Sequence, residues 1–360
     1  MSGPLYVPVL SARRHATAAY RNLSPAVQSD VIPLWNLPPR HGTASDVLAA
    51  FMRREARDVS KAQRHHPAWI DLPFADETQL RLFAPVLRDL GKTSVLRPVT
   101  GPGRPEHQQA VALEVARRSA SGVGIRVALP GEWDEGRTQP VRELLARLDP
   151  ADEADLLLDL GAVRGDRPDA GKEALRALDA LIPLTPWRTS AVLGGGFPEV
   201  TAQMLEQGLH AEPRTDWHTW QELAESSRSH TPLLSYGDYG IQPARAIGRE
   251  PASGKGGPAW GVLRYTTAES FVLGKVLGRG EDRIAVNRAA ARQFLELPDF
   301  RGPAASAGES WLRDCAHGHG PTGTGNASDW LRVGNIQHMT YVVRSLRPQP
   351  GSIPPTGPLS

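Results

Sequence analysis

The chain has 360 residues, 40% of them hydrophobic, and its 41 lysines and arginines nearly balance 39 aspartates and glutamates. This length suits one large α/β domain with an appendage, or two domains. The arginines are scattered rather than gathered with aromatic residues on one segment, which argues against direct nucleic acid binding. The single cysteine, Cys315, excludes an internal disulfide framework.

Membrane and export signals are also missing from the sequence pattern. No run approaches the roughly 20 apolar residues of a membrane-spanning helix. Residues 1–15 lack the long apolar stretch of a secretion signal. We therefore expect no membrane association and a cytoplasmic location.

Eight short apolar runs with the character of β-strands recur along the first two thirds of the chain. They cover residues 5–10, 31–37, 68–74, 94–99, 122–129, 155–161, 189–195 and 232–237. Amphipathic segments separate the runs and predict helices. These segments are 45–63 with Ser45 as N-cap, 78–91, 106–122, 140–149, 172–182, 200–208 and 217–228.

Strands that alternate with helices and are apolar on both faces indicate a parallel sheet buried on both sides. Eight such units favour an α/β fold of the closed (β/α)8, TIM-like barrel type. An open doubly wound sheet is the alternative. Residues 11–18, SARRHATA, lack the glycine-rich loop that a dinucleotide-binding open sheet places after its first strand.

The pattern changes after about residue 245. We expect a barrel over 1–245, an appended α+β region over 246–347 that packs on or near the barrel mouth, and a disordered proline-rich tail over 348–360. Within the appended region, 260–276 predicts a β-hairpin and 281–297 an amphipathic helix.

Polar residues lie near the ends of the predicted strands, where barrels of this type carry their functional groups. They are Asn36, Asp71, Arg97, Arg126 and Asp159. Charges inside apolar strands are costly unless they are paired or solvated. The four charged residues therefore form either a structural ion-pair network or a ligand site, and the two interpretations are compatible. Asp71 and Asp159 would also permit a divalent metal, although no histidine-rich set supports one.

Three consecutive glycines, Gly194, Gly195 and Gly196, end the seventh run and precede FPEV at an expected helix start. Backbone N–H groups in such a loop can hold a phosphate. A tight strand-to-helix turn is the competing interpretation.

Asp238 and Tyr239 follow the eighth run directly, within Gly-Asp-Tyr-Gly. Asp238 is a candidate general base, and Tyr239 a candidate hydrogen-bond donor to an oxyanion. The alternative is a turn that closes the barrel. On the functional interpretation, Asp238→Ala abolishes activity without unfolding the protein.

Two features of the appended region carry weaker signals. Arg264 and Tyr265 in the predicted hairpin either cap the barrel mouth and contact a ligand or make ordinary cross-strand contacts. Cys315, His317 and His319 resemble metal ligands, but no fourth ligand is evident, so we expect no metal site there.

An ordered set of short stretches runs over residues 5–345. It includes YVPVL, VIPL, WIDL, GIRV, LLLDLG, GGGFP, RTDWHTW, SYGDYGI, LRYT, CAHG and a late His-Met-Thr. This set resembles the beta family proteins, which are named after a phage beta protein. The resemblance carries Asp71, Arg126, Asp159, Asp238, Tyr239, Arg264 and Tyr265 as family-like positions, without assigned roles. It implies an acidic residue where this chain has Asn36, and a histidine pair where it has Gln337 and His338.

Two functional hypotheses follow. In the first, the mouth of the barrel is an enzyme site for hydrolysis or group transfer on a polar or phosphorylated small molecule. Asp71, Asp159, Asp238 and Tyr239 are then the catalytic candidates, and the ligand-binding candidates are Asn36, Arg97, Arg126, Gly194, Gly195, Gly196, Arg264, Tyr265 and His338.

In the second hypothesis, the barrel is a scaffold for a protein partner in phage–host conflict, to which the resemblance points. Aromatic residues of the appended region would then be the anchors. They are Trp260, Phe271, Trp311 and Trp330. Burial of these side chains would count against this hypothesis.

Overall fold

The computed structural model describes residues 3–64, 66–90, 95–250, 258–320 and 323–347. Eight parallel strands close into a barrel in the order β1-β2-β3-β4-β5-β6-β7-β9, which confirms the predicted TIM-like barrel. The strands are β1 (Tyr6–Ser11), β2 (Leu34–Asn36), β3 (Ala68–Asp71), β4 (Leu96–Thr100), β5 (Val123–Ala128), β6 (Ala154–Ala162), β7 (Thr189–Gly195) and β9 (Leu234–Asp238).

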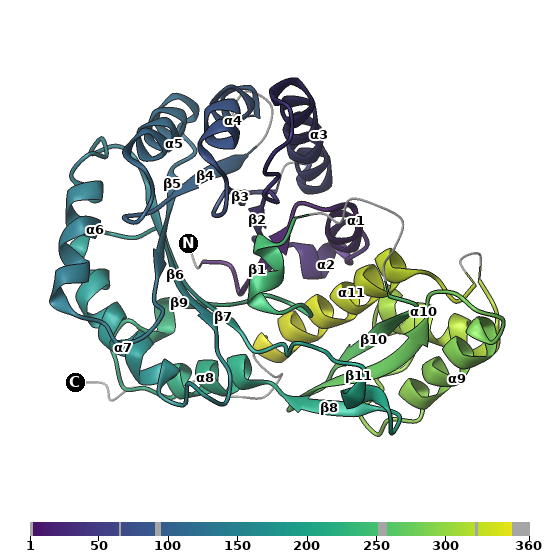
Figure 1. Cartoon of the computed structure of the whole chain (residues 1–360). Helices are drawn as coiled ribbons and strands as arrows, with labels where there is room; N and C mark the ends of the chain where they lie inside the picture. The colour runs from purple at the N-terminus through teal and green to yellow at the C-terminus, as the bar shows by residue number, and fades with distance from the viewer. Residues whose placement is uncertain (1–2, 65, 91–94, 251–257, 321–322, 348–360) are drawn as a thin grey trace.

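Helices from the connections surround the strands (Figure 1). They are α1 (Arg14–Arg21), α2 (Pro25–Gln28), α3 (Ser45–Gln63), α4 (Glu77–Leu90), α5 (Glu106–Ser119), α6 (Thr138–Leu145), α7 (Ala170–Leu181) and α8 (Thr215–Ala224). The strands are nearly continuous apolar runs because both of their faces are covered. Val7, Leu34, Trp69 and Leu157 pack with other residues inside the barrel, and separate apolar clusters fill the space under the helices.

A second, three-stranded sheet lies beside the barrel, in the order β10-β11-β8. Its strands are β10 (Trp260–Thr266), β11 (Ser270–Leu277) and β8 (His210–Pro213). The hairpin expected over 260–276 and the helix expected over 281–297 are both present. Three helices complete the region: α9 (Arg283–Leu295), α10 (Ala307–His317) and α11 (Ala327–Leu346).

The connection between β7 and β9 differs from the sequence expectation. The helix predicted over 200–208 is wrong, because that stretch forms only the short 3-10 turn η3 (Gln203–Leu205). The strand β8, which the sequence did not predict, follows and pairs with β11 from Leu273↔His210 to Ser270↔Pro213. A partner strand more than 50 residues away in the sequence therefore decides the local structure here.

The helix α11 connects the two parts of the molecule. It packs against both α1 and β10, and in Figure 1 it runs from the second sheet back along the barrel. Phe197, Ile241, Val262 and Phe271 form an apolar cluster where the barrel loops meet the sheet. The proline-rich tail expected over 348–360 lies outside the described residues. None of the helices that the structure describes has the length and apolar character needed to cross a membrane.

Candidate functional site

A cavity of about 770 Å³ lies at the carboxyl end of the barrel strands. Residues at the carboxyl ends of β5 and β6, and in the loops after β3, β4, β5 and β9, line it, and they include Phe74, Arg104, Trp133, Asp159 and Tyr239. This end of the barrel is where the sequence pattern placed the site, because all eight strands run in the same direction.

The side chain of Arg126, on β5, lies at the centre of a buried polar network beside this cavity. Its Nη1 atom donates to Asn36 Oδ1 at 2.8 Å and to Asp71 Oδ2 at 2.8 Å. Its Nε atom donates to Asp159 Oδ2 at 2.9 Å, and its Nη2 atom donates to the hydroxyl of Tyr239 at 3.0 Å. Four residues predicted from separate strand ends are thus joined by one guanidinium.

Tyr239 and Asp159 complete the network on the side that lines the cavity. The Tyr239 hydroxyl donates to Asp159 Oδ1 at 2.6 Å, and the Gly161 N–H donates to the same oxygen at 2.9 Å. Burial, followed by the charge of Asp159, raises the pKa of Tyr239. Burial alone would lower the pKa of Arg126, but Asp159, Tyr239 and Asp71 hold it above its usual value. Tyr239 is therefore a neutral donor and Arg126 a permanent cation.

The two carboxylates considered for a metal already share a cation. Arg126 bonds both Asp71 and Asp159, and Arg104 adds a second ion pair to Asp71 at 3.0 Å. A divalent ion between these carboxylates would have to displace the Arg126 guanidinium. In the part of the chain that the structure describes, no group of three or more His, Cys, Asp or Glu side chains is arranged to hold a metal.

Arginine dominates the charge of the cavity lining. Arg104, Arg126, Arg137 and Arg245 line the cavity, whereas Asp159 is the one acidic residue of the described chain among the lining. Arg137 and Arg245 also pair with Asp134 and Glu199, which do not line it. The rest of the lining is largely apolar or aromatic. An anion attached to an apolar group matches this surface best.

Asp238 belongs to a second network on the opposite face of β9. Its carboxylate accepts from Tyr6 Oη at 2.5 Å, Tyr236 Oη at 3.0 Å, the Gly240 N–H at 2.8 Å and His338 Nε2 at 2.9 Å. His338 Nδ1 in turn lies 2.8 Å from the hydroxyl of Thr266. Asp238 is 1% exposed and His338 is not exposed at all, so this network is sealed between β1, β9 and α11.

Electrostatics explain how so many polar groups are tolerated there. Burial opposes ionisation of Asp238, but His338, Tyr6 and the Gly240 N–H together hold its pKa below the ordinary value. Burial raises the pKa of the neighbouring Asp216, while the charge of Arg214 acts against that rise. Tyr236 donates to Asp216 at 2.5 Å and so links the two carboxyl groups.

The two positions that depart from the family resemblance have defined contacts. The amide oxygen of Asn36 accepts from Arg126, so an acidic residue there would add a further carboxylate to the network. Gln337 accepts from the Thr266 N–H at 2.8 Å and donates to the Thr266 carbonyl at 2.8 Å. Gln337 therefore fixes α11 to the end of β10.

Arg97 lies at the amino-terminal end of the barrel, far from the cavity. Its Nη1 atom is 3.5 Å from Asp155 Oδ2, and Asp155 also accepts from Arg188 and from the indole of Trp69. Arg97 is near the start of its strand, so its side chain lies at the opposite end of the barrel from the mouth. It therefore does not lie where the sequence pattern placed a ligand-binding residue.

The three glycines do not line the cavity among the described residues. A Cβ atom on Gly196 would lie 2.1 Å from Asp216 Oδ1, so glycine permits the close approach of α8. No α-helix begins at residues 197–200, which removes the helix N-terminus expected to hold a phosphate. The placement favours the tight-turn interpretation.

The candidates of the appended region and the metal-like motif are also placed away from the cavity. The Tyr265 hydroxyl donates to the Asp299 carbonyl at 3.3 Å and accepts from the Arg301 N–H at 3.1 Å within that region's core. Arg264 lies on β10 with its guanidinium 5.6 Å from the Phe197 ring. Cys315 is buried in α10, and burial raises the pKa of its thiol to about 11.

Sequence reasoning missed several residues that line the cavity. Arg104, Trp133, Arg137 and Arg245 lie in loops beyond the strand ends. Extending the strand-end rule into the following loop finds Arg104, in the GPGRP stretch after β4. Arg137 and Arg245 follow their strands by nine and seven residues and carry no comparable signal.

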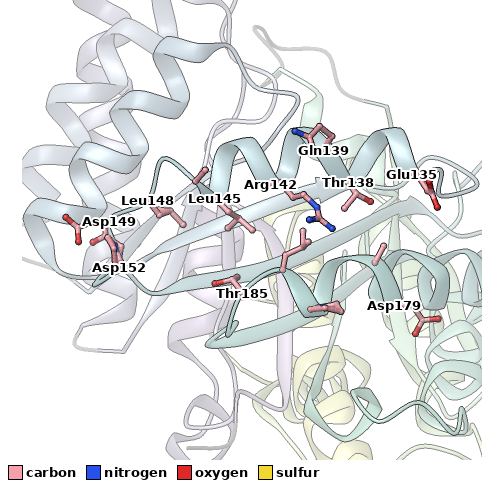
Figure 2. A pocket seen from close by; sticks show the side chains of 15 residues that line it. Glu135, Thr138, Gln139, Arg142, Leu145, Leu148, Asp149, Asp152, Asp179 and Thr185 are labelled. Atoms are coloured by element: carbon pink, nitrogen blue, oxygen red, sulfur yellow. The ribbon is translucent and has the colours of Figure 1, made fainter.

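A second depression of about 1080 Å³ lies between α6 and α7 on the outside of the barrel. Figure 2 shows Asp149 and Asp152 at one end of this groove and Glu135 and Asp179 at the other. These acidic side chains do not converge on a common point, and the groove is remote from the strand ends. It therefore offers no constellation for chemistry.

The comparisons with known proteins assign the family. The fold and the site define a (β/α)8 barrel whose mouth combines arginines with a largely apolar lining. Residues 6–344 match the beta protein family, and the chain belongs to that family. A search of curated proteins finds no match.

Solved structures that resemble the chain do so at low identity. A mutant tryptophan synthase alpha-subunit from the hyperthermophile Pyrococcus furiosus has a TM-score of 0.42 and 12% identity, covering 69% of this chain and 90% of that one. A mandelate racemase/muconate lactonizing protein from Herpetosiphon aurantiacus has a TM-score of 0.36 and 10% identity, covering 78% and 65%. These similarities do not identify a function.

Proposed function

We propose that the barrel mouth binds a small molecule that joins an anionic group, such as a phosphate, to an apolar part, and that the protein acts on it as a hydrolase or transferase. The observation that carries the proposal is the cavity itself: Arg104, Arg126, Asp159 and Tyr239 line it together with apolar and aromatic side chains. Guanidinium groups are well suited to phosphate and carboxylate oxygens.

Each polar residue has a distinct role in this proposal. Arg126 is the fixed cation that orients Asp159 and Tyr239, while Arg104 and Arg137 contact the anionic group. Tyr239 donates a hydrogen bond, and Asp159, 2.6 Å away, accepts the proton that the reaction releases. Asp238, Arg97, Tyr265 and His338 have no part in it, because their side chains are bonded elsewhere.

The test is a thermal-shift screen of the purified protein against sugar phosphates, nucleoside monophosphates and aromatic carboxylates, with titration calorimetry of the best compound. A ligand that binds only the native state raises the melting temperature. We expect the dissociation constant to rise about tenfold or more in Tyr239→Phe, a loss of about 1.4 kcal/mol. It should stay unchanged in Arg97→Met, which removes an arginine from the opposite end of the barrel. Equal effects of both variants would contradict the proposal.

Turnover separates two versions of the proposal. General acid–base catalysis typically contributes about 10²–10⁴-fold, so Asp159→Asn should lower the rate with the identified ligand by at least about 100-fold. One observation favours binding without chemistry: both oxygens of Asp159 already accept hydrogen bonds, from Arg126, Tyr239 and Gly161. A ligand that binds tightly and is never converted supports that second version.

The scaffold alternative has less support. Of its four candidate anchors, Phe271, Trp311 and Trp330 are 1%, 8% and 3% exposed, so they pack within the molecule. Trp260 is partly buried against the cluster between barrel and sheet.

A further inference from the structure

Phe74, in the loop after β3, is a large apolar side chain that stays exposed beside the cavity at the barrel mouth. Its exposed fraction is 43%, and of the exposed large apolar side chains in the part of the chain that the structure describes, it is the one that lines this cavity. Burial of a phenyl ring is favourable, so its exposure in a concave site marks the ring as a surface that a ligand can cover.

One face of the Phe74 ring is already covered by the segment η5 (Ala244–Gly248), which follows β9. A Cβ atom on Gly248 would lie 3.2 Å from Cδ2 and Cε2 of the ring and 3.3 Å from Cδ1. Because Cδ1 and Cδ2 are on opposite sides of the ring, Gly248 lies over the ring face and not at an edge. The neighbouring Ile247 is buried inside the barrel and fixes this segment. The ring is therefore held from one side, and its remaining surface lines the cavity.

The guanidinium of Arg104 is fixed close to the segment that carries this ring. Its Nη1 atom donates to the Leu72 carbonyl at 3.3 Å, two residues before Phe74, and its Nη2 atom pairs with Asp71 at 3.0 Å. The loop of Arg104 is held in turn by Gln109, whose amide donates to the Arg104 carbonyl at 3.0 Å. A cation and an exposed ring thus belong to the same part of the cavity, and both have rigid supports.

Trp133, from the loop after β5, adds a second aromatic surface to the cavity. Its indole N–H donates to Thr138 Oγ1 at 3.3 Å, which leaves the ring system as the surface it offers. Aromatic side chains gain from offset or edge contacts with other rings, beyond the area that they bury. A planar ring therefore matches this lining better than an aliphatic group of the same size.

We propose that the apolar part of the ligand is a planar aromatic ring that stacks on the open face of Phe74, while its anionic group binds Arg104. The inference rests on the function proposed above and narrows the substrate class of that site to aryl phosphates. Phe74 then determines specificity by direct contact with the substrate and takes no part in proton transfer.

Phenyl phosphate and cyclohexyl phosphate are the probes, because they carry the same anionic group on six-membered rings and only the first ring is planar. Titration calorimetry of the full chain should show phenyl phosphate binding about three- to tenfold more tightly. Equal dissociation constants, or a preference for cyclohexyl phosphate, overturn this inference and leave the anion site of the proposed function in place. Failure of both probes to bind overturns the inference and the proposed function together.

Phe74→Leu tests where the ring is recognised, since it keeps an apolar side chain but removes the planar face. Because Phe74 is exposed, we expect this variant to fold. The preference for phenyl phosphate should disappear, while cyclohexyl phosphate binds as it does to the wild type. Phe51→Leu, on α3 and outside the cavity lining, is the matched control and should keep the preference. A preference that persists in Phe74→Leu overturns the inference, because the ring is then recognised elsewhere.

Arg104→Met tests the contact to the anionic group. It should weaken both probes by about tenfold and leave the preference between them unchanged, because the ring contact is made by a different residue. Unchanged binding of both probes in Arg104→Met places the anionic group elsewhere and overturns the inference.

Discussion

Asp238 and Tyr239 are neighbours in the sequence but belong to two networks on opposite faces of the barrel wall. Tyr239 joins Arg126 and Asp159 beside a cavity of about 770 Å³. Asp238 joins Tyr6, Tyr236 and His338 in a sealed space under α11. Side chains alternate between the two faces of a strand, so one step along the chain separates a group that a ligand can reach from one that it cannot.

The comparison teaches that a polar residue at a strand end has two common uses in a barrel. The mouth network holds Arg126 with carboxylates and still lines the cavity. The sealed network supplies four donors to one carboxylate and joins β1, β9 and α11, which are far apart in sequence. The first arrangement suits recognition and the second suits stability.

The largest expected effect comes from breaking the sealed network. Asp238→Ala leaves the buried donors of Tyr6 and His338 without their acceptor, while Tyr236 keeps Asp216, and it should lower the free energy of unfolding by about 3–5 kcal/mol. Urea denaturation measures this. The sequence alone suggested lost activity without unfolding, and an unchanged unfolding free energy in Asp238→Ala would restore that interpretation.

Breaking the mouth network should affect binding more than stability. Tyr239→Phe removes one hydroxyl, but Arg126 and Asp159 keep their other bonds, so the free energy of unfolding should fall by only about 1–3 kcal/mol. The dissociation constant of the identified ligand should rise about tenfold. A Tyr239→Phe protein that binds as tightly as wild type would move the site away from this network.

The pH dependence of stability sharpens the comparison. The pKa of His15 in the folded protein, about 4, is below its ordinary value of 6.5. Between these two values the unfolded chain binds a proton at His15 and the folded chain does not. The contribution of His15 to the free energy of unfolding is therefore fully present above pH 6.5 and is lost as the pH falls toward 4. His15→Gln should flatten this part of the urea-derived stability profile.

The sealed network behaves differently on acidification. The pKa of Asp238 is lowered from 3.8, so its stabilising contribution is present above that value and is lost only at lower pH. The raised pKa of Asp216 acts with the opposite sign, favouring the folded state as the pH falls.

A profile that stays as steep between pH 6.5 and 4 in His15→Gln would place the acid-sensitive group elsewhere.

The smallest effect is expected at the amino-terminal end of the barrel. Arg97→Met removes a 3.5 Å ion pair, but Asp155 keeps its bonds to Arg188 and Trp69. The free energy of unfolding should change by roughly 1 kcal/mol or less, with ligand affinity intact. A loss of affinity would show that the two ends of the barrel are coupled.

The sequence predicted the barrel because eight apolar runs alternate with amphipathic segments, a pattern that favours a (β/α)8 barrel over an open sheet. It also predicted a charged network of Asp71, Arg97, Arg126 and Asp159. Arg126 does bond Asp71 and Asp159, with Asn36 as a further partner, but Arg97 pairs with Asp155 instead. The sequence could not predict β8, whose partner strand is distant and whose own residues have no strand pattern.

The sequence was weaker on the orientation of side chains. Arg97 and Arg126 both lie in apolar runs, but one is near the start of its strand and the other near the end. Asp238 and Tyr239 differ only in the face they take, which depends on where β9 ends. The cavity arginines at 137 and 245 come from loops, where no periodic pattern fixes their position.

One paired experiment tests the central claim most directly: calorimetric titration of the identified ligand, with urea denaturation, on Tyr239→Phe and Asp238→Asn. The account predicts that Tyr239→Phe weakens binding about tenfold and that Asp238→Asn, although less stable, binds as wild type does. Weakened binding in Asp238→Asn with intact binding in Tyr239→Phe would contradict the assignment of the two networks.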